Sequence, residues 1–193
     1  MSQSRIVTVD GRRQRSERNK KAIIDAALAL IESGVLMPTA QQVSDRAGVA
    51  MRTFFRHFHD METLFAAIDD ASREKLESFF RAQVPQGSLE ERIEKVVSHR
   101  ISAYEQIKTF AMSAQAQLWR SEYLRKRHAA DQRRLRQDLD NRLPELSTLA
   151  SQQREFADAM TSFDMWYRLR VHQDLSRKAS IELVARSLKD LFR

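Results

Sequence analysis

The chain has 193 residues, with 33 Lys and Arg against 26 Asp and Glu, four Gly, three Pro and no Cys. So few glycines and prolines argue against an all-β fold, which needs many turns, and exclude Gly-rich nucleotide-binding motifs. The absence of Cys excludes thiol catalysis, disulfides and Cys-based zinc sites. No apolar run approaches the ~18–20 residues of a membrane span, and no apolar block follows the basic N-terminus. We therefore expect an all-α cytoplasmic protein, and the net charge of +7 favours an anionic partner.

The chain is predicted to begin with a basic arm followed by one long helix. Residues 1–15 contain four Arg and show no apolar periodicity, which predicts a disordered arm. Apolar residues then recur at helical spacing, so we expect a first helix from near Ser16 to Ser33. Gly34 follows directly, and glycine is suited to the left-handed conformation that ends many helices.

The next segment is predicted to form two short helices joined by a tight turn. Thr39 and Gln42 form a capping-box pattern that opens a helix over 40–47, and Gly48 supplies the positive φ of a turn. A second short helix is expected over 50–57. Four apolar residues are spaced to point inward, namely Val43, Val49, Phe54 and Phe58. A helix of this size fits the DNA major groove, with its outer face against the base edges.

Six further helices are predicted in the rest of the chain. Asp60 caps a helix over 61–82, and Ser88 with Glu91 forms a capping box for a helix that reaches Lys108. The remaining helices are expected over 109–119, 122–143, 150–172 and 177–192. The helix over 122–143 is rich in Arg with interleaved Asp, which favours a solvated face with ion pairs one turn apart. The alternative for this helix is an entry patch for an anionic effector, such as a coenzyme-A thioester.

The segment between residues 39 and 64 contains a motif of particular residue types at fixed spacing. Its members are Thr39, Val43, Ala47-Gly48-Val49, Thr53-Phe54-Phe55-Arg56-His57-Phe58 and Glu62-x-Leu64. In this register the segment resembles the tetracycline-repressor (TetR) family of bacterial transcriptional regulators. The resemblance implies a helix-turn-helix DNA-binding domain of three helices over 16–60. It also implies a helical-bundle domain for effector binding and dimerisation over 61–193. Four positions depart from the family's pattern, namely Ala50, Arg52, Phe55 and Met61. Phe55 and Met61 stand where Tyr and Lys are usual, so the phosphate contacts of those two side chains are lost.

Candidate DNA contacts lie on the arm and on the two short helices. Arg52 is suited to pair with guanine O6 and N7, although a solvated Arg or a phosphate clamp is the alternative. The arginines of the arm would follow the DNA backbone or enter the minor groove. The alternative is that they only make the N-terminal tail more soluble. No His has a partner at metal-ligand spacing, so we expect no metal site and no cofactor. The predicted contacts are Arg12, Arg13, Arg15, Thr39, Gln41, Ala50, Met51, Arg52, Thr53, Phe55 and His57.

The resemblance also implies an effector pocket and a dimer interface in the second domain. The expected pocket residues are Phe80, Tyr104, Phe110, Met112, Trp119 and Phe163. The expected interface lies on the last two helices, at Phe156, Met160, Trp166, Tyr167, Ile181, Val184 and Leu188. For each of these residues, simply filling the core of one chain is the alternative.

Together these patterns predict a sequence-specific regulator, a homodimeric repressor that binds a pseudo-palindromic duplex and is released by an unknown small molecule. The helix over 61–82 joins the two predicted domains and is the expected lever. Two other classes of function remain open. One is an adaptor that keeps the fold but binds protein instead of specific DNA. The other is a helical-bundle enzyme, which would need clustered inward carboxylates or a Glu-x-x-His pair that this sequence lacks.

Overall fold

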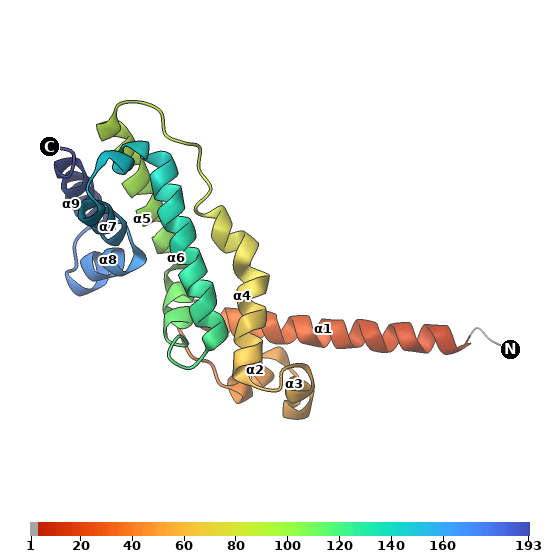
Figure 1. Cartoon of the computed structure of the whole chain (residues 1–193). Helices are drawn as coiled ribbons and strands as arrows, with labels where there is room; N and C mark the ends of the chain where they lie inside the picture. Colours follow the sequence, from red (N-terminus) through yellow and green to blue (C-terminus); the bar gives the residue numbers. More distant parts are fainter. Residues whose placement is uncertain (1–3) are drawn as a thin grey trace. The chain divides into compact units, whose positions relative to one another are not determined.

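The computed structural model describes residues 4–193, with side chains described from residue 11 onward, and every regular element in this part of the chain is helical. The predicted all-α fold is confirmed (Figure 1). No helix among the described residues is long and apolar enough to cross a membrane. The α-helices are α1 Ser4–Glu32, α2 Ala40–Ala47, α3 Met51–His57, α4 Met61–Ser78, α5 Leu89–Gln115, α6 Glu122–Arg142, α7 Ser151–Met160, α8 Phe163–Tyr167 and α9 Arg177–Asp190. A 3₁₀ turn, Pro144–Thr148, follows α6, and a π-helical turn, Arg168–His172, follows α8.

The chain divides into two compact units. The first unit comprises the residues through Lys75 together with Thr109–Arg125. Its core is built from side chains of α1 to α4, with one contribution from the start of α6. The fully or nearly fully buried members include Ile23, Ala27, Ile31, Val43, Phe54, Phe58, Leu64, Ile68 and Leu124. Residues 61–75 and 109–125 of the predicted second domain thus pack with the N-terminal helices.

The second unit comprises Leu76–Lys108 and Lys126–Arg193. Its buried apolar residues come from α5 to α9 and from the 3₁₀ turn after α6 with the residue that precedes it. They include Ile93, Val97, Ile101, Tyr104, Leu139, Leu143, Leu146, Phe163, Trp166, Val184 and Leu188. Several of the side chains expected at a dimer interface are therefore part of this unit's own core.

The predicted arm is helical where the structure describes it. Helix α1 begins at Ser4 instead of near Ser16 and runs without interruption to Glu32 (Figure 1). Residues 1–3 of the predicted arm lie outside the described residues. The segment lacks apolar periodicity, but Gln and Arg are good helix formers and no Pro interrupts the backbone hydrogen bonds of the longer helix. The other end agrees with the prediction, since Gly34 has φ +98° and its N–H donates to the Ile31 carbonyl at 2.9 Å.

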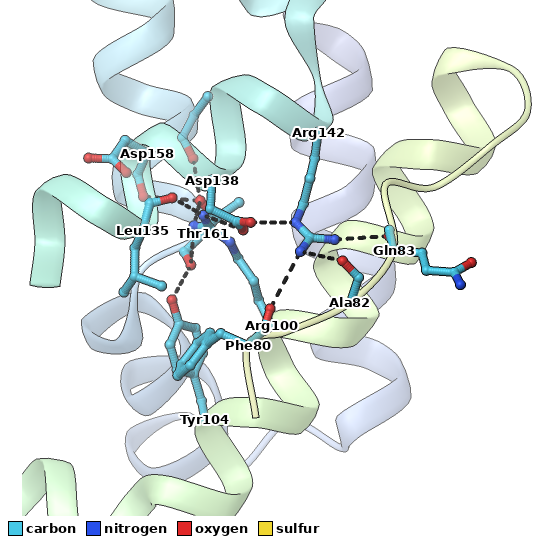
Figure 2. A network of polar contacts seen from close by, with 11 residues as sticks. Phe80, Ala82, Gln83, Arg100, Tyr104, Leu135, Asp138, Arg142, Asp158 and Thr161 are labelled. Carbon is cyan, nitrogen blue, oxygen red and sulfur yellow. Dashed lines mark hydrogen bonds and ion pairs between the residues drawn. The ribbon is translucent and has the colours of Figure 1, made fainter. Parts of the chain in front are cut away.

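Helix α4 ends at Ser78, four residues before the predicted end at 82. The reason is a side chain from α6. The Arg142 guanidinium donates to the carbonyls of Gln83 at 3.2 Å, Ala82 at 3.1 Å and Phe80 at 3.4 Å (Figure 2). These contacts stabilise the irregular backbone after α4 and satisfy carbonyls that have no partner within the helix.

The predicted helices over 88–108 and 109–119 are one helix. Helix α5 passes through Lys108 and Thr109 without a break and ends at Gln115. No Gly or Pro lies near the expected boundary, so nothing in the local sequence interrupts the hydrogen bonds. Its start is as predicted, because the Ser88 N–H donates to Glu91 at 2.9 Å and the Glu91 N–H donates to the Ser88 hydroxyl at 3.3 Å.

The predicted helix over 150–172 is broken at Thr161 and Ser162. Tyr104 donates its hydroxyl proton to the Thr161 carbonyl at 2.8 Å, and Arg100 donates to the Thr161 hydroxyl at 3.0 Å (Figure 2). Ser162 then caps α8 through its side chain, which accepts from the Met165 N–H at 3.2 Å. Buried polar groups from α5 thus stabilise a turn where the sequence periodicity predicts a continuous helix.

Candidate nucleic-acid interface

Helix α2 is fixed at its start by a complete capping box. The Thr39 N–H donates to Gln42 Oε1 at 2.9 Å, and the Gln42 N–H donates to Thr39 Oγ1 at 3.2 Å. The predicted cap is confirmed, and it leaves Thr39 exposed at the N-terminal end of the helix. Free backbone N–H groups at such an end favour anions.

The turn between α2 and α3 depends on Gly48. Its φ of +66° lies in the left-handed region, where a Cβ would be strained. The following Val49 N–H donates to the Ser44 carbonyl at 3.0 Å, and the Ser44 hydroxyl donates to Met51 Sδ at 3.2 Å. The turn therefore ties the first residue of α3 to the middle of α2.

Helix α3 is anchored by aromatic residues on its inner side. Phe54 is completely buried and Phe58 nearly so, with their ring centroids 6.1 Å apart. Asp60 caps the following helix, since its Oδ1 accepts from the Thr63 N–H at 2.8 Å, as predicted. Hydrogen bonds from Thr63 hold the pKa of the Asp60 carboxyl below its usual range. The anchored inner side fixes which residues of α3 face outward.

The outer face of α2 and α3 contains most of the predicted contact residues. Arg52 and Phe55 are exposed, with 49% of Phe55 accessible, and Ala50 and Gln41 are also exposed. Gln41 donates to Asp45 Oδ1 at 2.7 Å, so its amide is already engaged within α2. Met51 and Thr53 are half-buried, and the bond from Ser44 explains why Met51 is less available than predicted. Arg56, which the predicted set omits, is exposed beside them.

His57 lies at the end of α3 in a cationic environment. Desolvation lowers its pKa below the ordinary value, and the neighbouring charges of Arg56 and Lys20 lower it further, while Glu17 opposes them. Its Nε2 atom is buried and has no hydrogen-bond partner among the described residues, so this atom is not presented to a ligand. Within residues 11–193, no group of three or more His, Asp or Glu side chains is arranged to hold a metal ion.

The predicted arm contacts Arg12, Arg13 and Arg15 lie on α1 and are exposed. They stand on an ordered helix instead of a flexible tail. Lys20, also absent from the predicted set, belongs to the same helix and is close enough to His57 to affect its pKa. The signal for Lys20 was present in the sequence, because it follows Arg13 by about two helical turns and so shares its side of a helix.

The six predicted pocket residues are divided between the two units. Phe80, Tyr104 and Phe163 form one cluster in the second unit, where both neighbouring rings lie 5.7 Å from the Tyr104 ring centroid. Phe110, Met112 and Trp119 belong to the first unit. Phe110 packs against that unit's core, whereas Trp119 is 75% exposed.

A polar layer adjoins the aromatic cluster of the second unit (Figure 2). Arg100 is buried and donates to the Leu135 carbonyl and to Thr161, while its Nη2 lies 3.7 Å from Asp138. Asp138 also accepts from Arg142 Nε at 2.7 Å. Burial raises the pKa of Tyr104 to about 12. Beside this layer lies a cavity of only about 10 Å³, lined by residues that include Arg100, Tyr104, Thr161 and Trp166, so there is no room for an organic ligand at this position in this conformation.

The predicted interface residues fall into two groups. Four of them are buried within the chain, namely Met160, Trp166, Val184 and Leu188. Tyr167 and Ile181 are half-buried, and Phe156 on α7 is 47% exposed. Leu183 on α9, which was not predicted, is 42% exposed.

Three arginines of α6 are engaged by carboxylates. Arg136 makes two bonds of 2.6 Å to Glu155, and Arg134 donates to Glu77 at 2.9 Å. Arg142 is buried on Asp138. This geometry agrees with the interpretation of an ion-paired face and gives no support to an anion entry patch.

Comparison with known proteins agrees with the geometry of the N-terminal unit. Residues 23–68 match the family model described as bacterial regulatory proteins, tetR family. None of the functionally curated proteins matches this sequence significantly.

Solved structures with a similar fold extend over nearly the whole chain. A transcriptional regulator from Rhodococcus sp. Rha1 is 16% identical with a TM-score of 0.64, and covers 91% of this chain and 95% of its own. A transcriptional regulator (TerR/AcrR family) from Aquifex aeolicus VF5 is 17% identical with a TM-score of 0.59, over 89% of this chain and 98% of its own. A regulator from Streptomyces coelicolor A3(2) gives 18% identity and a TM-score of 0.59, over 89% and 98%. The part of the chain that contains the helix-turn-helix thus matches the tetR family model, and the fold around it is similar to that of these solved regulators.

Proposed function

We propose that this protein is a homodimeric cytoplasmic repressor that binds a specific operator and leaves it when a small molecule binds the second unit. The observation that supports the proposal best is the outer face of α3. It presents Arg52 and Arg56 to solvent, while Phe54 and Phe58 fix the helix from behind. A rigid helix with exposed arginines is the element that reads base edges in the major groove.

In this proposal Arg52 reads a base and Thr39 places the start of α2 on a phosphate. Two copies of α3 would enter successive major grooves about 34–36 Å apart on a pseudo-palindromic site. Phe55 would pack against the sugar, since it has no hydroxyl to donate. Arg52 is near the N-terminal end of α3, where side chains of a recognition helix reach base edges.

The test is fluorescence-anisotropy binding to the duplex upstream of the protein's own gene, at two salt concentrations and against unrelated competitor duplex. We expect competitor-resistant binding, and Arg52→Ala should weaken it about 10- to 100-fold, the cost of about 1–3 kcal/mol for a lost bidentate base contact. Arg133→Ala is the matched control, because Arg133 is an exposed arginine of the second unit. If the own-gene duplex fails, selection of bound genomic fragments supplies the operator. Equal binding of all fragments would contradict a sequence-specific regulator and favour the adaptor.

Dimerisation is proposed through α7 and α9. Phe156 and Leu183 are large apolar side chains left exposed on these two helices, which pack on each other within the second unit. Phe156→Asp should convert a dimer to a monomer in analytical ultracentrifugation. Val84→Asp is the control, because Val84 is 54% exposed but lies outside both helices. A monomeric wild-type protein would contradict this part of the proposal.

Effector release is proposed to act by a population shift. The cavity beside Tyr104 is smaller than any organic effector, so a ligand that binds at this position must select a more open conformer of the second unit. Coupling of about 1–3 kcal/mol between effector and operator is sufficient for an ordinary response. Helix α4, which has residues in both units, is the proposed lever. Compounds that raise the melting temperature should be tested for release of labelled operator; stabilisation without release would argue against an effector role.

A further inference from the structure

The positive charge of this protein is concentrated on a short part of α1. Residues 11–21 contain six basic residues and one acidic residue, which gives a net charge of +5, whereas the whole chain has +7. Five of the six basic residues make no hydrogen bond or ion pair among the described residues. Only Lys21 is paired, with Asp25 at 2.6 Å. So much unpaired charge of one sign on one helix is costly in isolation and indicates an anionic partner.

Part of this charge lies on the side of α1 that faces the helix-turn-helix. Lys20 precedes the buried Ala27 by about two helical turns, and Arg12 precedes the buried Ile23 by about three, so each lies in line with a core residue. Arg13 in turn lies about two turns before Lys20. Ser16 and Asn19, on the same side, are half-buried. By contrast, Lys21 and Arg18 lie on other sides of the helix.

The same side of α1 reaches the end of α3. Helix α1 packs against α3. The charges on Glu17 and Lys20 of α1 are among those that act on His57, the last residue of α3. Arg56 precedes His57 and is exposed. Arg12, Arg13 and Lys20 are thus exposed along α1, and Arg56 is exposed near the end of α3 that α1 packs against. We name these four residues the cationic strip.

We propose that the cationic strip binds the phosphate backbone of the duplex beside the bases read by α3, as an ordered helix and not as a flexible arm in the minor groove. This inference rests on the proposed function. Arg12 to Lys20 spans about 12 Å of helix, and one DNA strand has a phosphate every 3.4 Å or so along its axis. The strip thus matches about three successive phosphates. Its contacts add affinity and salt dependence without adding sequence information.

The test measures how duplex affinity depends on salt concentration, for the operator and for unrelated duplex. Arg12→Ala/Arg13→Ala should reduce the slope of log K against log salt by about 1.8 for each bound protomer, because each lost phosphate contact removes about 0.9. The reduction should be the same on both duplexes. Lys21→Ala/Lys75→Ala is the control, since it removes the same charge from two exposed, ion-paired lysines of the first unit. An equal reduction in the control would overturn the proposal, because it would reflect net charge only.

A second pair of variants separates an ordered helix from an arm. Gln14→Pro keeps every charge but interrupts α1 between Arg13 and Lys20. We expect it to reduce the salt slope as the double alanine variant does, with Gln14→Ala unchanged and circular dichroism confirming that the rest of the fold remains. An unchanged slope in Gln14→Pro would overturn the helical strip.

The proposed function has its own readout in the same assay. Loss of discrimination in Arg52→Ala together with an unchanged slope in Arg12→Ala/Arg13→Ala would refute the cationic strip alone. A wild-type protein that does not distinguish operator from unrelated duplex would refute the proposed function. The strip would then still be judged by the slopes on unrelated duplex.

Discussion

The two units of this protein use the same residue type in opposite ways. On α1 and α3 of the first unit, Arg12, Arg13, Arg52 and Arg56 are exposed and have no partner among the described residues. In the second unit most arginines are paired with carboxylates or backbone carbonyls. These include Arg92 with Glu145, Arg100 with the Leu135 carbonyl, Arg134 with Glu77, Arg136 with Glu155, Arg142 with Asp138 and Arg154 with Asp140. Arginine therefore stabilises the fold of the second unit, whereas the arginines on α1 and α3 of the first unit are left exposed.

Counting the charged residues of each segment does not reveal this difference. Residues 122–142 contain seven basic residues, more than the six in residues 11–21. The four acidic residues of α6, and others from α4 and α7, neutralise most of that charge locally. A basic segment indicates nucleic-acid binding only when its cations lack carboxylate partners in the fold.

The largest change in the free energy of unfolding is expected when a buried arginine of the second unit is replaced. Arg100→Ala removes a buried cation that bonds to Thr161 and Leu135 and lies beside Asp138, so the free energy of unfolding should fall by about 3 kcal/mol. Urea denaturation measures the change. Arg12→Ala, an exposed arginine of the first unit, should stay within about 0.5 kcal/mol of wild type. If the two variants lost similar amounts of unfolding free energy, the proposed difference between the arginines of the two units would be wrong.

A smaller effect is expected at the cap of α2. Thr39→Ala removes the hydroxyl that accepts from the Gln42 N–H, so unfolding should become easier by about 1 kcal/mol. Thr39→Ser keeps the hydroxyl and should remain near wild type. The comparison is made by thermal denaturation followed by circular dichroism. If the serine variant lost as much as the alanine variant, the methyl group and not the cap would be the important feature.

The smallest effect is expected from pH. Because burial and nearby cations hold the pKa of His57 below 6.5, its ring is neutral at pH 7 in the free protein. A bound phosphate backbone would raise this pKa, so binding would take up a proton and affinity should increase as the pH falls from 7.5 to 5.5. A shift of one pKa unit corresponds to at most about tenfold in affinity.

Duplex titrations over this pH range, with His57→Gln beside the wild type, test the prediction. The glutamine variant should show a flatter pH profile. A profile of the same steepness in both proteins would assign the proton uptake to another group.

Local signals predicted the elements that local contacts determine. The capping boxes at Thr39 and Ser88 and the left-handed Gly48 each involve residues within a few positions of one another, and all three are present. The inward positions of Val43, Phe54 and Phe58 also followed from periodicity. The exposed face of α3 was therefore predictable from the sequence.

The features that were missed depend on distant residues. The early end of α4 and the break at Thr161 are stabilised by Arg142, Arg100 and Tyr104, which lie roughly sixty positions away in the chain. No window of neighbouring residues contains that information. In the candidate site, the approach of Lys20 to His57 has the same origin, because it joins two helices that are separate in sequence.

The bonds from Arg142 to the backbone after α4 also link two segments that are synthesised at different times. The carbonyls of Phe80, Ala82 and Gln83 obtain these partners only when the last turn of α6 is in place. Contacts of such long sequence separation form late, because a large loop must first be closed. During synthesis, the end of α4 leaves the ribosome well before the residue that terminates it. A chain truncated before Arg142 would therefore lack the side chain that stabilises the native end of α4, which lies some sixty residues earlier in the sequence.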